Sequence, residues 1–370
     1  MALIGSINSP NDFGFKNRII NGAMIIAQRG TTTTLAANSY GFGLDRFQVF
    51  NLGAATCSVI QSTNVPSSTN GFINSHQVDV TLADASIAAA DLYMIRHVIE
   101  GLNVTDLAWG TANAKPITLS FWVSSSKTGT HFVSFKNSAQ DRVYAASYTI
   151  SVANTWEFKT ITVTGDQSGT WLTTNGTGIQ VVWALAIGTD YHTPTANVWA
   201  AGDHYSTSAQ VNVMDNAANN FYITGVQVEK GSTATAFDYR SYDTELNLCL
   251  RYYLHIYMAA GNVHYMIMLM PTNPGTSNFG FIPLTTPMRI PNPAFVLYPA
   301  YDTGSDWNLN NAIVNYPFTG VPTIVSGSAG ISPSSIGINV QVSTAMNLGY
   351  PTFFYNNTGT NGYIALNAEL

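Results

Sequence analysis

The sequence predicts an all-β protein: a jelly-roll-like β-sandwich followed by a smaller C-terminal β-sandwich domain, with short helices. Segments of alternating apolar and polar residues recur at regular intervals, with turn-forming residues between them. These segments do not alternate with long helical patterns, as the strands of a parallel sheet would. Charged residues make up only 9% of the 370 residues, and Ser, Thr, Asn and Gly take their place. This composition suits a surface of β-turns and uncharged hydrogen-bonding groups.

The strands of the first domain are expected in two groups. An early group comprises residues 18–30, with a turn at Asn21-Gly22, and residues 44–50, where apolar and polar side chains alternate. The later group is spaced as in an antiparallel sandwich and comprises residues 117–123, 130–135, 142–152, 157–164, 179–187 and 221–228.

One helix is expected before the end of this domain, from Asp84 to Leu102. Asp84 can cap its first turn, and apolar residues follow at helical spacing. They are Ile87, Leu92, Ile95, Val98, Ile99 and Leu102.

The stretch from Phe221 to Tyr253 connects the two domains. Its first part predicts a strand with Tyr222, Thr224, Val226 and Val228 on one face and Phe221, Ile223, Gly225 and Gln227 on the other. After a turn at Gly231, the segment from Thr244 predicts a short helix that Thr244 caps. The predicted parts are an N-terminal arm (1–16), the jelly-roll-like sandwich (17–240), a helical hinge (241–253) and the C-terminal β domain (254–370).

Composition and charge exclude several classes of function. A net charge of −6 argues against binding of a nucleic-acid backbone, which needs clustered Lys and Arg. The two cysteines predict buried thiols in a reducing cytoplasm and no disulfide framework. The N-terminal residues do not form a secretory signal, and polar residues interrupt the most apolar region, so no membrane insertion is expected. Low charge also favours burial of surface between copies of the chain, in a homo-oligomer.

The sequence contains no recognisable catalytic motif, so no catalytic residue is assigned. A polysaccharide depolymerase would need a pair of carboxylates, and no spacing selects two of Asp190, Asp203, Asp215 and Glu229. The alternative is that these acids cap turns or pair with arginines. His192 and His204 share a segment with three of these acids, but their spacing matches no metal site. We therefore assign no metal and no cofactor.

Aromatic and polar residues that suit a sugar site gather in the long segment 188–220. Sugar rings stack on Trp and Tyr, and amides, carboxylates and imidazoles bind their hydroxyls. The candidate glycan-binding residues here are Tyr191, His192, Trp199, Asp203, His204 and Tyr205. Alternatively, Trp199 and Tyr205 fill a core or a subunit interface. Trp307 and Tyr355 are further candidates, in the C-terminal domain.

Several segments resemble a known family. They are ITGVQVEKGSTATAF followed by TELNLC and RYY, the earlier NRIINGAM, LDRF, IEGLNVTDLAWGTANAKPITLSFWV and YTISVANTWEFKTITVTGD, and the closing YIALNAEL. In this order they resemble segments of bacteriophage tail-fibre and other virion surface proteins, and the first domain resembles a carbohydrate-binding module. The second likeness leaves room for a structural calcium ion, to which no residue is assigned.

The resemblance implies a virion structural protein, assembled in the host cytoplasm and located on the tail or capsid surface. One expectation is a tail-fibre or adsorption protein that binds a host-surface polysaccharide, trimeric by analogy with phage fibres. It would attach to other virion proteins through its N-terminal arm. A second is a capsid-surface decoration or cement protein without receptor recognition, and a third is a polysaccharide depolymerase. The sequence does not decide between tail and capsid.

Overall fold

The chain divides into two compact units, residues 1–241 and 242–370. The predicted N-terminal arm lies outside the described residues except for Lys16. The computed structural model describes residues 16–258, 268–271, 277–290, 293–298, 307–311, 314–317, 323–325, 335–341, 352–356 and 362–370.

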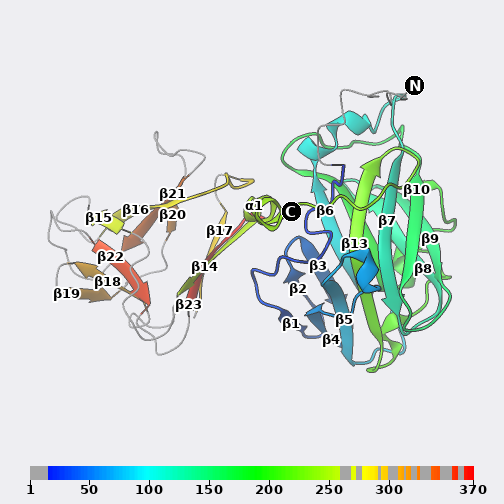
Figure 1. Ribbon diagram of the computed structural model, residues 1–370, viewed down its shortest axis with the longest axis horizontal. Helices are drawn as coiled ribbons and strands as arrows, with labels where there is room; N and C mark the ends of the chain where they lie inside the picture. Colours follow the sequence, from blue (N-terminus) through cyan, green and yellow to red (C-terminus); the bar gives the residue numbers. More distant parts are fainter. Residues whose placement is uncertain are drawn as a thin grey trace, which may run out of the picture. The chain divides into compact units, whose positions relative to one another are not determined.

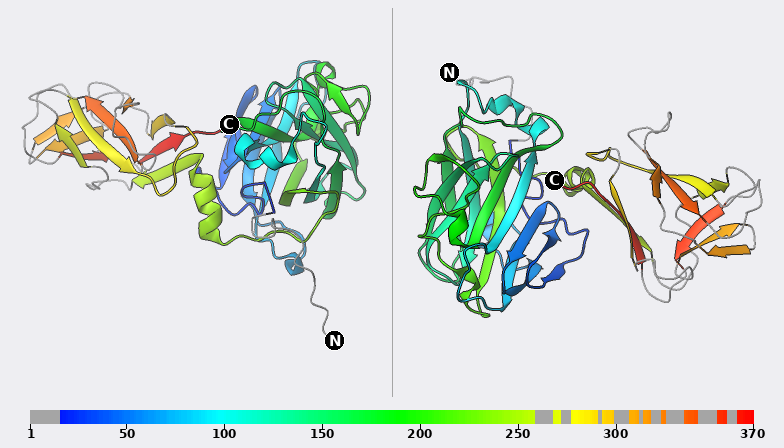
Figure 2. Two further views of the ribbon diagram at one scale, coloured as in Figure 1. Left: turned by 90° about the horizontal axis from the view of Figure 1, so that it is seen from above. Right: turned by 180° about the vertical axis from the view of Figure 1, so that it is seen from behind.

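The first unit is a sandwich of two antiparallel sheets, whose layers can be followed in Figures 1 and 2. The order of the six-stranded sheet is β1 (Thr32–Leu35), β4 (Thr56–Ser62), β5 (Ser75–Leu82), β13 (Asn220–Lys230), β7 (Ile117–Ser125) and β10 (Glu157–Val163). The order of the seven-stranded sheet is β12 (Trp199–Ala201), β9 (Arg142–Ile150), β8 (Gly129–Lys136), β11 (Thr177–Ile187), β6 (Leu92–Glu100), β3 (Phe47–Leu52) and β2 (Ser39–Leu44). The predicted all-β, jelly-roll-like sandwich is confirmed.

Short 3₁₀ helices occur in the connections of this unit. They are η1 (Ser68–Asn70), η2 (Gly101–Asn103), η3 (Thr105–Leu107), η4 (Thr189–Tyr191) and η5 (Val213–Asp215). Of all the helices in the described parts of the chain, none is long and apolar enough to cross a membrane.

The later group of predicted strands is confirmed as β7, β8, β9, β10, β11 and β13, but the early group is wrong in part. Residues 18–30 form turns and no strand, because the side chain of Asn21 bonds both the backbone N–H and the C=O of Ile26. Residues 44–50 contain the turn between β2 and β3. There the Asp45 carboxylate accepts the backbone N–H of Gln28 at 2.7 Å, and Arg46 adopts a φ of 70°.

The predicted helix from Asp84 to Leu102 is wrong, because its second half is strand β6. β6 pairs with β3 and β11 at its two edges, and its side chains are buried on both faces of the sheet. Ile95 points into the sandwich and Met94 packs on the opposite face, and both are buried. Such a strand is apolar on both faces, and this pattern is easily mistaken for a helical stripe. Asp84 caps no helix and accepts the hydroxyl hydrogen of Tyr93 at 2.6 Å.

Strand β13 contains a β-bulge that the predicted alternation lacked. Its pairing with β7 shifts by one residue between Thr224 and Gln227, and Gly225 adopts a φ of 59°. The extra residue reverses the phase of the alternation. The prediction therefore assigned the faces wrongly: Phe221, Ile223, Val226 and Val228 all lie in the core between the sheets.

The second unit contains helix α1 (Tyr242–Leu250) and two further sheets. Helix α1 starts before Thr244, which lies within its first turn and not at its cap. One sheet has the order β14 (Tyr253–Met258), β23 (Gly362–Asn367) and β17 (Ala294–Tyr298). The other has the order β19 (Val314–Pro317), β18 (Trp307–Asn311), β22 (Thr352–Asn356), β15 (Met268–Pro271), β16 (Ser277–Pro283), β21 (Ser335–Gln341) and β20 (Thr323–Val325).

Candidate functional site

The long segment that follows β11 packs on the outer face of the seven-stranded sheet, the face turned away from the other sheet. Tyr205 is buried there, in a cluster with Phe132 and Val182. Tyr191 packs against the same cluster, and its ring centroid lies 5.8 Å from that of Tyr205. The segment thus contributes two of the predicted glycan-binding aromatics to a covered apolar layer.

Lys136 ties this segment to the sheet. Its ammonium lies 3.6 Å from the ring centroid of Tyr205, contacts the Asp203 carboxylate, and is 3.3 Å from Oε1 of Gln140. The side chain of Lys136 is fully buried, and burial lowers its pKa to about 8, although Asp203 acts in the opposite direction. Asp203 and Tyr205 are therefore both engaged by a buried cation.

Trp199 lies apart from this group, in an aromatic cluster with Trp109, Trp171 and Tyr144 at centroid distances of 5.4, 5.5 and 5.3 Å. Its indole N–H donates to the backbone oxygen of Thr164 at 2.8 Å.

The remaining candidates are scattered. Nε2 of His192 is 3.0 Å from the backbone oxygen of Ile187, and the His204 ring lies against Gly202. Trp307 and Tyr355 belong to the paired strands β18 and β22 of the second unit. The structure therefore groups Tyr191, Asp203 and Tyr205 and separates them from Trp199.

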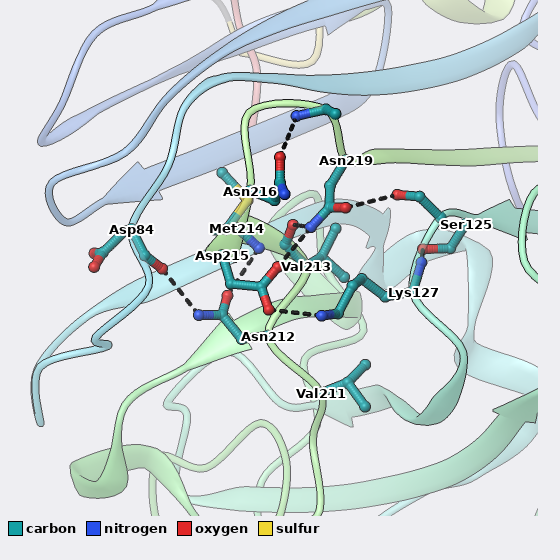
Figure 3. A network of polar contacts seen from close by, with 12 residues as sticks. Asp84, Ser125, Lys127, Val211, Asn212, Val213, Met214, Asp215, Asn216 and Asn219 are labelled. Atoms are coloured by element: carbon teal, nitrogen blue, oxygen red, sulfur yellow. Dashed lines mark hydrogen bonds and ion pairs between the residues drawn. The ribbon is translucent and has the colours of Figure 1, made fainter.

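Three of the acids considered for catalysis, Asp203, Asp215 and Glu229, have structural partners. The Asp215 carboxylate accepts from the ammonium of Lys127 at 2.6 Å and from the amide of Asn219 at 2.7 Å, inside the polar network shown in Figure 3. The same network includes Asn212, whose amide donates to the backbone oxygen of Asp84 at 2.9 Å. In the part of the chain that the structure describes, no three His, Cys, Asp or Glu side chains group as a metal site would need.

A pocket of about 540 Å³ opens on the outer face of the six-stranded sheet, in a place that we did not predict. Its lining contains five aromatic side chains and no charged side chain: Thr69, Asn70, Phe72, Ser120, Trp122, Phe158, Gly225, Thr235, Ala236, Phe237 and Tyr239. We call it the aromatic pocket. Its volume is in the range of small-molecule sites.

The sheet supplies the floor and one wall of the aromatic pocket. Ser120 and Trp122 alternate with core residues of β7, so both point outward. Phe158 is opposite Trp122 on the edge strand β10, with 5.3 Å between the ring centroids, and it is 48% exposed. Gly225 is at the bulge of β13, and a Cβ there would be 2.6 Å from the ring of Phe72.

Three further aromatic rings form the other wall. Phe72 follows η1, and its ring centroid is 5.1 Å from that of Phe237 and 5.6 Å from that of Tyr239. The ring centroids of Phe237 and Tyr239 lie 4.8 Å apart. The Tyr239 hydroxyl donates to the backbone oxygen of Asn70, which joins the two segments of this wall.

Residues 232–239, which we call the wall segment, are held on the sheet by two buried polar side chains of β13. The Glu229 carboxylate accepts from the backbone N–H and the hydroxyl of Thr235, both at 2.8 Å. Oε1 of Gln227 accepts the backbone N–H of Asp238 at 2.8 Å. These bonds satisfy buried groups and fix Phe237 and Tyr239 over the sheet.

Sequence reasoning missed the aromatic pocket because its residues come from distant segments. Trp122 falls inside the strand predicted over residues 117–123 and was not among the candidate residues. Its outward position on β7 was the available signal, together with Phe237 and Tyr239 just after β13.

Comparisons with known proteins add resemblances of fold. No family model matches the chain, and no curated protein matches it. An enzymatically active domain of tailspike protein 4 from bacteriophage CBA120 is similar at 11% identity and a TM-score of 0.29, over 58% of this chain and 21% of that one. This chain therefore spans about a fifth of that protein's length.

Two other solved structures are similar over most of their own length. A family 4 carbohydrate-binding module matches at 14% identity and a TM-score of 0.28, over 57% of this chain and 99% of its own. A putative sugar-binding protein from Bacteroides thetaiotaomicron matches at 11% identity and a TM-score of 0.30, over 58% and 99%. The fold assignment itself rests on the strand pairing described above.

Proposed function

We propose that this chain is an adsorption protein of a bacteriophage virion, whose first unit binds a host-surface glycan in the aromatic pocket. The observation that carries the proposal is the lining of that pocket, where five aromatic side chains surround uncharged polar groups. Apolar C–H faces of a sugar stack on aromatic rings, and hydroxyl and amide groups beside them bind sugar oxygens. Trp122 and Phe158 form one such platform.

The virion role is supported by the resemblance of the sequence segments and by the low charge of the chain. Within this proposal the chain forms a homo-oligomer, a trimer by analogy with phage fibres, and residues 1–16 attach it to other virion proteins. The candidates Tyr191, Asp203 and Tyr205 then stabilise the fold opposite the binding face.

The test is binding of the purified full-length protein to cells of a strain that the parent phage infects. Saturable binding that competes with phage adsorption is expected, and Trp122→Ala and Phe158→Ala are expected to abolish most of it. Trp156→Ala is the matched control, since Trp156 contacts Asn64 and does not line the pocket. Absence of binding by folded protein would contradict the proposal and favour a decoration protein. Release of reducing sugar from host polysaccharide would favour the depolymerase.

A further inference from the structure

Given the proposed glycan-binding function, the chemistry of the aromatic pocket restricts its ligand further. We infer that it takes an uncharged sugar residue in which deoxy, methyl or acyl groups replace some of the hydroxyls. The inference depends on three observations: which polar groups of the pocket are already engaged, the lack of charge, and the aromatic walls on two sides.

Most of the hydroxyl groups that line the pocket already bond within the protein, and those that donate there can offer a sugar only an acceptor. The Thr69 hydroxyl is 3.2 Å from the hydroxyl of Ser67, and the Thr235 hydroxyl donates to Glu229. The Tyr239 hydroxyl donates to a backbone oxygen. A fully hydroxylated hexose carries a hydroxyl on nearly every ring carbon, and each one loses water when buried. The pocket would leave several of them unsatisfied.

Three polar side chains of the lining remain available. The hydroxyl of Ser120, the amide of Asn70 and the indole N–H of Trp122 make no hydrogen bond within the described residues. Ser120 is only 3% exposed as a residue, yet its hydroxyl is not sealed from solvent and reaches the pocket. Its hydroxyl lies on the floor, so a ligand in the pocket would supply the partner that the protein does not.

The lining also excludes charged sugars. It contains no Lys, Arg, His, Asp or Glu. Glu229, just beyond it, is occupied by both donors of Thr235 and by the amide of Gln227 at 3.0 Å. Burying a carboxylate, phosphate or ammonium group without a partner is strongly unfavourable. Uronic, sialic and amino sugars are therefore poor ligands.

The aromatic walls favour apolar substituents. The Trp122–Phe158 platform lies on the sheet side, and the rings of Phe72, Phe237 and Tyr239 form the other wall. A sugar ring that stacks on one aromatic wall turns its remaining substituents toward the other aromatic wall. Those substituents must therefore be apolar as well. A methyl group or the methyl of an acetamide gains free energy by losing contact with water there, whereas a hydroxyl would lose its hydrogen bonds.

The experiment measures binding of matched methyl glycosides to the full-length protein by Trp fluorescence and ligand-observed NMR. Each of the gluco, galacto and manno series contains the parent hexoside, its 6-deoxy form, its 2-acetamido form and its uronate. We expect the 6-deoxy or 2-acetamido form of one series to bind at least about fivefold tighter than its parent, since one unsatisfied hydroxyl has that effect or more. The uronate of that series is expected not to bind.

Two variants separate the possible outcomes. Ser120→Ala, which keeps the aromatic walls, is expected to weaken the preferred glycoside by about fivefold. Thr160→Ala is the control on the neighbouring strand, facing Ser120 outside the lining. Equal or tighter binding of parent or uronate, or no glycoside binding at millimolar concentration by protein that still binds cells, would overturn the ligand class alone. Loss of cell binding as well would contradict the proposed function.

Discussion

Gly225 combines two roles at one position, because it forms the bulge of β13 and part of the pocket floor. Its φ of 59° is accessible to glycine at little cost, and the ring of Phe72 occupies the space that a side chain would need. The same residue therefore determines which β13 side chains reach the core and how closely Phe72 approaches the sheet.

Gly225→Ala is expected to lower the free energy of unfolding by about 1–3 kcal/mol, from the positive φ and the contact with Phe72. The measurement is urea denaturation followed by Trp fluorescence. In the Phe72→Ala background the contact with the Phe72 ring is absent. Gly225→Ala should therefore lower the free energy of unfolding by less there, through the positive φ alone. Equal costs in both backgrounds would show that the contact is unimportant.

The candidate residues show how far a sequence determines a site. Aromatic and polar residues within one segment were predicted to meet, and Tyr191, Asp203 and Tyr205 do meet. Neighbourhood in sequence did not indicate which way these side chains point, and Tyr205 is buried under a cation. The aromatic pocket joins residues from five segments, and only the register of the sheet places them together.

Among the elements, the wall segment 232–239 shows how β13 organises the unit. Gln227 and Glu229 are on the outer face, and each binds backbone of the wall segment. After it, the Arg240 guanidinium donates to the backbone oxygen of Ile19 at 3.1 Å. The segment ITGVQVEKGSTATAF, which carries part of the family resemblance, therefore has a structural role. It forms β13 and then leads the chain back over the outer face of that strand.

Glu229→Ala is expected to release the wall segment. It removes three hydrogen bonds to a carboxylate, two from Thr235 and one from the amide of Gln227, each worth about 1.5–3 kcal/mol, and leaves these donors unsatisfied. Faster limited proteolysis within residues 231–240 and weaker glycan binding should accompany it. Asp215→Asn, which weakens the half-buried ion pair with Lys127 far from the wall segment in sequence, is the control. Unchanged proteolysis would show that the rings of Phe237 and Tyr239 hold the segment alone.

At this scale, position in the sheet did not decide which strands the sequence predicted: among the confirmed strands of the first unit, only β10 lies at a sheet edge. β7 and β10 alternate because one face packs on the core. β6 is apolar on both faces, and the period that distinguishes strand from helix is lost. No strands were predicted over β4 and β5, where Ser, Thr, Gln and Asp on the outer face dilute the apolar signal.

Across the whole first unit, neutral histidines are buried in the sandwich. His76, His97 and His131 are fully buried. Burial lowers the pKa of His76 to about 3 and that of His131 to about 4. Burial, followed by the charge of Arg46, lowers the pKa of His97 well below its usual value. The folded protein therefore binds fewer protons than the unfolded chain under mildly acidic conditions.

The free energy of unfolding is expected to fall as pH decreases from about 6.5 toward 4, and to be flat just above that window. Below pH 6.5 these three histidines bind protons in the unfolded chain but not in the folded protein. Each can contribute up to about 1.4 kcal/mol per pH unit. The measurement is urea denaturation across this range. His76→Leu should reduce the slope by up to that amount, and an unchanged slope would contradict the assignment.

A fragment of residues 1–241 is expected to unfold at the same urea concentration as the first unit of the full chain and to bind the same glycoside. Its core runs from Ile19 to Val228, and the aromatic pocket ends at Tyr239. Chemical denaturation and the glycoside titration check both parts. A fragment that folds but does not bind would show that the second unit contributes to the site.

The residues of the aromatic pocket differ in how freely they can be substituted, because some of them also stabilise the fold. The pocket's floor and the anchors of its wall also maintain the bulge, the β13 register and the closure of the sandwich, so substitutions there carry a folding penalty. Asn70 and Phe158 do not maintain these features. Asn70 ends the short helix η1, and Phe158 is on the edge strand β10. Under the proposed function, variants with altered host range are therefore expected to accumulate changes at these two places and to preserve Glu229 and Gly225.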